Sequence, residues 1–154
     1  MRPLIPPNVP SLYDPARRQE LVDRLARLRP DAAARWGKFT APQMVTHLIE
    51  GMRMAAGELT VAPRHLPLLP IVRPLVLHVF PFPKGAPTAR ELLARVPTTW
   101  EADVGTLRTK VEAVREPAPG TRLPDHPAFG PMSARDWGVL LYKHADHHFR
   151  QFGI

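Results

Sequence analysis

One stretch decides the fold of this chain: residues 133–153, SARDWGVLLYKHADHHFRQFG. At about 100° per residue, its apolar positions Trp137, Leu140 and Leu141 fall on one side of a helix. Ser133 is a typical helix N-cap, and Gly153 is a typical helix end. The pattern therefore predicts a long amphipathic helix that packs one side into a core.

This stretch contains three of the seven histidines of the chain, His144, His147 and His148, within a span of five residues. His144 and His148 are four residues apart, so a helix stacks them on one face, and His144 shares the apolar side with Trp137. Burying two imidazoles without partners is costly. A shared metal ion satisfies both rings. His147 is three residues from His144 and could replace His148 geometrically, although we favour a place for it beside the site or on the surface.

A second helix start lies in residues 40–54, TAPQMVTHLIEGMRM. Thr40 and Gln43 have the spacing of a capping box, and Pro42 falls in the first turn, where its missing N–H costs nothing. His47 then shares the apolar face with Gly51, which we expect to leave open space beside the ring. Two helices thus point histidine inward.

These positions predict a three-histidine metal site made of His47, His144 and His148. Three protein ligands leave coordination positions for water or substrate, as in catalytic metal sites.

Three further residues, Glu50, His126 and His147, are candidates for a catalytic role. The sequence does not assign this role to any of them. Glu50 lies one turn beyond His47, where it could orient a ring or act as a base, but a solvated glutamate is the favoured interpretation. His126 follows Asp125 in a turn that could approach the mouth of the site, and a role in loop packing is slightly favoured. His147 is the third candidate. Asp146 points away from His144 and is expected to be exposed.

The composition indicates one soluble domain over residues 1–154. Hydrophobic residues make up 44% and charged residues 23% of the chain, and there is no cysteine. The lack of cysteine excludes disulfides, thiolate ligands and a cysteine nucleophile, so histidine and carboxylate remain as protein ligands. The N-terminus has no hydrophobic signal core, and we expect a cytoplasmic protein.

The net charge of +7 and the pI of about 10.8 would suit a nucleic acid or an acidic membrane. The arginines are scattered among acids, however, so we expect a small-molecule substrate and no nucleic-acid partner. The longest apolar stretch, residues 66–82, is interrupted by Arg73 and by prolines, which argues against a membrane span. We interpret it as buried, broken structure and expect no membrane partner. A homodimer through any exposed part of it stays open.

Helix signals divide the chain into four long helices and a proline-rich connection. The first 12 residues are expected to be an extended segment, and the connection, 60–96, to contain short helices over 68–79 and over 88–96, the second capped by Thr88. The four long helices start at or next to a capping signal and cover residues 14–29, 40–57, 99–114 and 133–153. No segment alternates like a strand. We therefore predict an all-α fold, a four-helix bundle, in which metal sites form between facing core positions.

Several motifs together resemble the DinB superfamily, and most closely its uncharacterised bacterial branch with an HPxFG element. The motifs are Trp36-Gly37-Lys38, Met44 with His47, His126-Pro127-Ala128-Phe129-Gly130, Trp137, and the ending His144-x-x-His147-His148-x-x-Gln151. The resemblance covers nearly the whole chain from about Ser11. It implies a DinB-like four-helix bundle with one divalent ion, zinc or nickel, on three histidines, which by position are His47, His144 and His148.

The resemblance also implies two reaction classes. Some members of the superfamily are thiol transferases that use low-molecular-weight thiols such as bacillithiol, mycothiol or glutathione, and a bound cation lowers the pKa of such a thiol. We therefore expect a metal-dependent enzyme that activates water or a thiol, a hydrolase or a thiol S-transferase. The alternative is a non-enzymatic helical bundle that binds a metal or another ligand.

Overall fold

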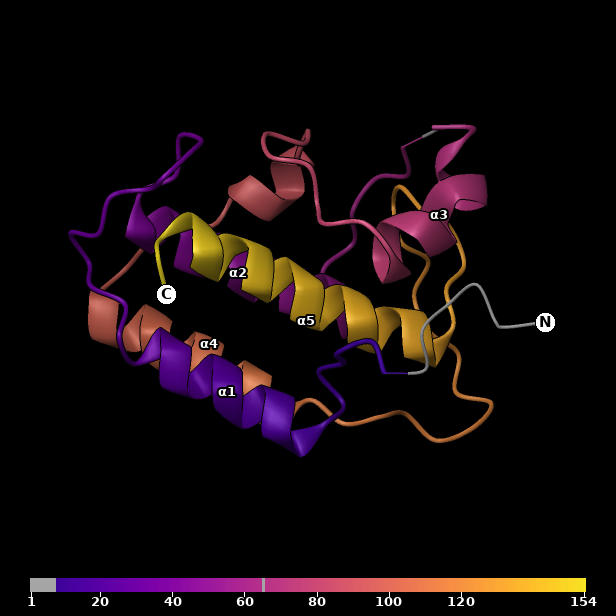
Figure 1. The fold of residues 1–154 in the computed structure, drawn as a ribbon, viewed down its shortest axis with the longest axis horizontal. Helices are drawn as coiled ribbons and strands as arrows, with labels where there is room; N and C mark the ends of the chain where they lie inside the picture. Colours follow the sequence, from indigo (N-terminus) through magenta and orange to yellow (C-terminus); the bar gives the residue numbers. More distant parts are fainter. Residues whose placement is uncertain (1–7, 65) are drawn as a thin grey trace.

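The computed structural model describes residues 8–64 and 66–154, and this part of the chain is all-helical, without a β-strand. The described residues form five α-helices, labelled in Figure 1, and one short 3₁₀ helix: α1 Pro15–Leu25, α2 Ala41–Ala55, α3 Leu69–His78, η1 Arg90–Leu93, α4 Trp100–Ala113 and α5 Ala134–Gln151. The predicted all-α class is confirmed. Most of the expected N-terminal extended segment, residues 1–7, lies outside the described residues.

The helix starts follow the capping signals of the sequence. The Thr40 hydroxyl accepts a hydrogen bond from the Gln43 backbone N–H, and the Gln43 side chain accepts one from the Thr40 N–H, so the capping box of α2 is present. Ser133 caps α5 by accepting from the backbone N–H three residues later. Gly153, which follows α5, has a φ of +78°, a left-handed conformation that glycine adopts without strain.

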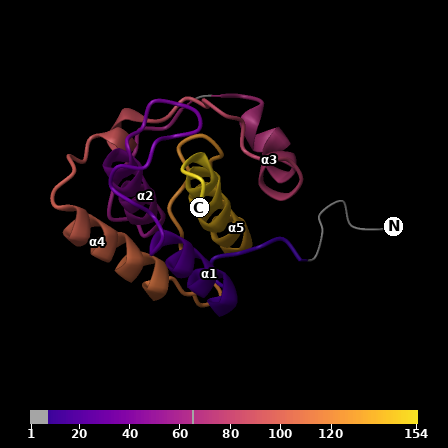
Figure 2. The ribbon, with the colours of Figure 1, turned by 60° about the vertical axis from the view of Figure 1, so that its left-hand side comes forward.

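Four helices share the main core. α1 contacts α4 and α5, and α2 contacts the same two helices, as the two ribbon views show (Figures 1 and 2). Each of the four contributes a side chain that is at most 1% exposed: Leu21, Ile49, Leu107 and Phe149. A smaller apolar cluster around Leu77 and Trp137 joins α3 to the N-terminal half of α5.

Three helix boundaries differ from the prediction. α1 ends at Leu25, well before Pro30, because the chain tightens there into i→i+3 turns. The 68–79 segment forms one continuous helix, α3, which tolerates Pro74 in its interior. The expected helix over 88–96 is only the 3₁₀ turn η1, and Thr88 does not cap it. Pro97 restricts the residue before it, which works against a longer helix.

Polar contacts fasten α3 to α5. His78 and Asp136 are hydrogen-bonded, with 2.8 Å between Nε2 and Oδ1. The Lys143 ammonium donates to the backbone carbonyls of Val76, Leu77 and Phe80, where a cation complements the C-terminal end of a helix dipole. None of the described helices has the length and apolar character needed to cross a bilayer.

Candidate metal centre

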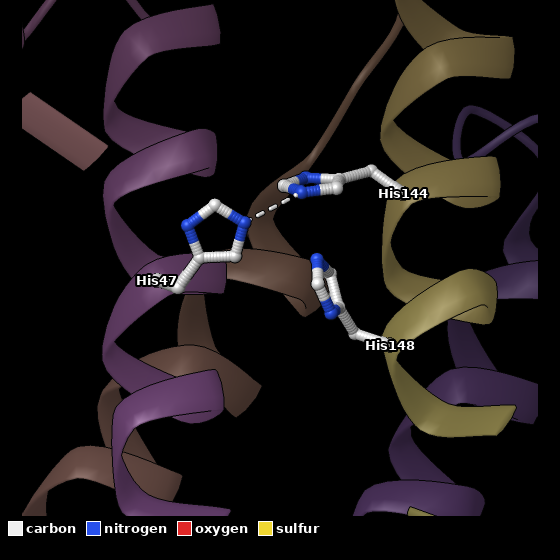
Figure 3. A group of neighbouring side chains, drawn as sticks. All are labelled: His47, His144 and His148. Carbon is white, nitrogen blue, oxygen red and sulfur yellow. Dashed lines mark hydrogen bonds between the residues drawn. The ribbon is translucent and has the colours of Figure 1, made fainter. Parts of the chain in front are cut away.

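Three histidine rings from two helices converge in the middle of the molecule. Figure 3 shows His47 on α2 facing His144 and His148, which lie one turn apart on α5. The ring centroids are 4.8–4.9 Å apart, and one nitrogen from each ring lies within 4.8 Å of the other two. Nε2 of His47 and Nε2 of His144 are hydrogen-bonded, 2.9 Å apart. The three residues predicted as ligands are therefore brought together.

Hydrogen bonds on the far side of two rings fix which nitrogen faces the cluster. Nδ1 of His47 lies 3.1 Å from the Leu92 carbonyl oxygen, which can only accept, so Nδ1 carries the proton. Nδ1 of His148 donates in the same way to Oε1 of Gln151, 2.8 Å away, and the amide of Gln151 donates to the Trp36 carbonyl. Both rings thus keep an unprotonated Nε2, as metal-ligating histidines require.

Burial keeps the three rings neutral at physiological pH. His47 is 3% exposed and His148 9% exposed, and Phe39 packs against both rings. This desolvation lowers the pKa of His47, and lowers the pKa of His148 to about 3. Burial also holds the pKa of His144 well below its usual value, with a further contribution from the neighbouring rings. Neutral imidazole is the form that binds a metal ion.

Gly51 gives the His144 ring its room. A Cβ at this position would lie 3.2 Å from Cε1 and from Nδ1 of His144, tighter than ordinary van der Waals contact. The open space that we expected beside His47 is thus taken by a ring from the facing helix. The absence of a side chain at Gly51 lets α2 carry one histidine and accommodate another.

We expect Gly51→Ala to weaken metal binding about tenfold, although alanine favours a helix by about 1 kcal/mol over glycine. The added methyl group would displace the His144 ring, one of the three predicted ligands. Competition with a chromogenic chelator measures the affinity. Gly105→Ala is the matched control, because nothing lies within 4 Å of a Cβ added there on α4. Equal affinities of the two variants would contradict this role of Gly51.

Glu50, one turn after His47, is buried rather than solvated. It is only 3% exposed, and its carboxylate accepts hydrogen bonds from Arg53 at 3.1 Å and from Arg95 at 3.4 Å. The sequence-based interpretation of a solvated glutamate is therefore wrong. Arg95 lies just beyond η1, the turn that supplies the Leu92 carbonyl, so this ion pair ties the turn to α2.

His126 makes its side-chain hydrogen bonds within its own loop. Its Nδ1 accepts from the backbone N–H groups of Ala128 and Phe129, at 3.1 and 3.2 Å, and its ring stacks on Phe129 and lies near Trp137. These contacts agree with the loop-packing role. Burial lowers the pKa of His126 from its ordinary 6.5 to about 4.

This shift predicts an acid-sensitive contribution of His126 to stability. Between pH 6.5 and 4 the unfolded chain binds a proton at this ring that the folded chain does not, so stability falls as the pH falls. From pH 7.5 to 5 we expect the wild-type protein to lose about 2 kcal/mol more unfolding free energy than His126→Asn. Asparagine keeps an acceptor near the Nδ1 position. Urea denaturation with a chelator present measures the difference, and parallel pH curves would refute it.

His147 lies next to the cluster, not in it. Its ring centroid is 5.1 Å from that of His148 and 5.6 Å from that of Trp36, and Phe82 lies 6.0 Å away on another loop. Burial lowers its pKa. Asp146, expected to be exposed, has a side chain only 17% exposed and pairs with Arg24 and Arg150, so that expectation is wrong.

Sequence reasoning missed the groups that orient the rings. For Gln151 a signal existed, because it lies three residues after His148 and so on the same side of α5. The Leu92 carbonyl had no such signal, since every residue carries a carbonyl and its position depends on where the chain places η1 against α2.

Comparison with known proteins identifies a family that the chain matches. No curated protein and no solved structure matches the chain. The family described as "Protein of unknown function (DUF1569)" matches residues 15–153, a range that includes every described helix and all three histidines of the cluster. The chain therefore belongs to the DUF1569 family.

Proposed function

We propose that this protein is a metal-dependent enzyme of the DinB type. α1, α2, α4 and α5 would form its four-helix bundle, and His47, His144 and His148 would hold one divalent ion. The observation that carries the proposal is the pair of Nδ1–H hydrogen bonds, to Leu92 and Gln151, that leave Nε2 of two rings unprotonated and turned inward. The sequence resemblance to the DinB superfamily supports the same three ligands.

The donor set fits one zinc or nickel ion. Three neutral imidazoles suit either metal. Nitrogens that share one ion lie about 3–4 Å apart, and here one pair is 2.9 Å apart and all three lie within 4.8 Å of one another. A pair of iron ions would need several inward carboxylates. α5 has no glutamate, and Glu50 is engaged by two arginines. One ion is thus favoured over two.

A bound divalent cation would lower the pKa of a coordinated water or thiol, which is the chemistry of a hydrolase or a thiol S-transferase. Residues of this chain would provide the approach for the substrate and a proton acceptor. His144 is the partly exposed member of the cluster, so solvent and a small substrate would approach from its side. His147, neutral and beside His148, is the nearest candidate for accepting a proton. A low-molecular-weight thiol is the proposed co-substrate.

A cytoplasmic location and the absence of a nucleic-acid partner are part of this proposal. Arginines on several helices are paired with acidic side chains, including Arg17, Arg24, Arg53, Arg108 and Arg150. Such pairing leaves fewer cations free for a phosphate backbone.

The burial of His47 and His148 favours a second candidate, a non-enzymatic bundle in which the ion is structural. The two functions share the metal and differ in turnover.

Protein purified without a histidine tag is expected to carry about one zinc or nickel ion per chain, measured by elemental analysis after metal loading and desalting. The loaded protein is then screened with electrophiles and with bacillithiol, mycothiol or glutathione. Turnover that depends on His144 supports the enzyme, and a metal-stabilised protein without turnover supports the structural alternative. Failure to retain stoichiometric metal overturns both.

A further inference from the structure

Exposed large apolar side chains gather on one segment of the described chain. Six of the eight lie between Leu66 and Phe80. Those on and beside α3 are Leu68 at 70%, Ile71 at 73%, Leu75 at 46% and Val79 at 49% exposure. Their spacing of three, four and four residues places them on one face of the helix, which we call the α3 face. The sequence-based interpretation of this stretch as buried is wrong for this face.

The charge of the same segment has a single sign. Between Glu58 and Glu91 the sequence has four basic residues and no acidic one. The basic residues are Arg64, Arg73, Lys84 and Arg90. Arg73 is partly exposed, and the other three are exposed. The acidic side chain packed against α3, Asp136, is already paired with His78 and Arg73. Glu91, at the end of the segment, attracts Arg64 and Arg90. Four basic residues against the two carboxylates Glu91 and Asp136 still leave a net positive charge in the segment that carries the α3 face.

The back of α3 is fixed, so the α3 face cannot turn inward. Leu77 is 1% exposed on the opposite side of the helix. Lys143 holds the C-terminal carbonyls and Asp136 holds His78, both from α5. α5 is the one described helix that α3 contacts, and Figure 2 shows α3 on the outside of the molecule, across α5 from α4. The apolar side chains are thus presented outward on a rigid support.

We propose that the α3 face docks on the surface of a lipid bilayer that contains anionic lipids. An amphipathic helix with an apolar stripe and basic neighbours lies in the plane of such an interface, with its apolar side chains in the acyl boundary. The positive segment attracts the lipid headgroups, whereas a second copy of this chain would bring the same positive charge against it. The inference does not rest on the proposed metal chemistry, and it replaces our expectation that the protein has no membrane partner.

Flotation of the full chain with vesicles tests the proposal. We expect binding to phosphatidylcholine vesicles that contain phosphatidylglycerol, weaker binding to phosphatidylcholine alone, and release at high salt. Leu68→Glu with Ile71→Glu should lower the binding at least about tenfold. Val96→Glu is the matched control, because Val96 is 77% exposed but lies outside the segment, and it should bind like the wild type.

Circular dichroism confirms that each variant is folded. The proposal is overturned if the wild type does not float with anionic vesicles, or if the double variant floats equally well. It is also overturned if light scattering shows a wild-type dimer that the double variant converts to a monomer, because a second copy then covers the α3 face.

Discussion

His144→Ala is expected to abolish stoichiometric binding of a divalent ion. The substitution removes one of the three proposed imidazole ligands, the ring whose Nε2 lies 2.9 Å from Nε2 of His47. Losing one such ligand lowers metal affinity roughly a hundred- to a thousandfold, since structural zinc sites with four ligands bind with about 10–16 kcal/mol. Isothermal titration with zinc and with nickel measures the loss, and elemental analysis after desalting gives the stoichiometry.

His147→Ala is the control for this experiment, because the residue lies three positions further along the same helix and outside the cluster. It should bind the ion with nearly wild-type affinity. If His147→Ala loses the ion and His144→Ala keeps it, the ligand set derived from the ring geometry is wrong. Both variants should keep the helical content of the wild type in circular dichroism, because alanine, a strong helix former, replaces a residue within α5.

Phe149→Ala is expected to cause the largest loss of stability, about 3–5 kcal/mol of unfolding free energy. The ring is 1% exposed in the core shared by α1, α2, α4 and α5, and the Arg24 guanidinium lies 5.4 Å from its centroid. Removing it leaves a cavity and a lost cation–π contact. Urea denaturation in the presence of a chelator measures the effect without a contribution from bound metal.

Phe80→Ala provides the comparison for a phenylalanine that is 56% exposed. We expect it to cost less than about 1 kcal/mol, because little apolar area returns to water. Similar losses in the two variants would show that Phe149 does not lie in the core as described.

The parts of the fold that depend on neighbouring residues could be predicted from the sequence. The capping box of Thr40 and Gln43 and the N-cap Ser133 act within one turn, and both helices begin where these signals stand. The histidine cluster could be predicted from the sequence for the same reason. Four-residue spacing places His144 and His148 on one face, and the apolar positions around each ring tell which face turns inward.

Features that depend on distant residues were not accessible in this way. Glu50 is buried because Arg95, 45 residues away in the sequence, reaches its carboxylate. The helices α2 and α3 have similar apolar content but differ in burial. α2 is covered by α4, η1 and α5, whereas α3 contacts α5 alone among the described helices. Hydropathy reports how apolar a segment is, but not whether another element covers it.

The distance between the ligands along the chain has a consequence for folding. His47 and His144 are separated by 97 positions, so an ion shared by them would close a loop of nearly two thirds of the molecule. Cross-links of this kind act mainly on the unfolded chain, whose conformational entropy they reduce. In a protein without cysteine, the ion would serve as a reversible cross-link in place of a disulfide. Chelation would then loosen the contact between α2 and α5 first, and resistance to proteolysis would follow the supply of metal.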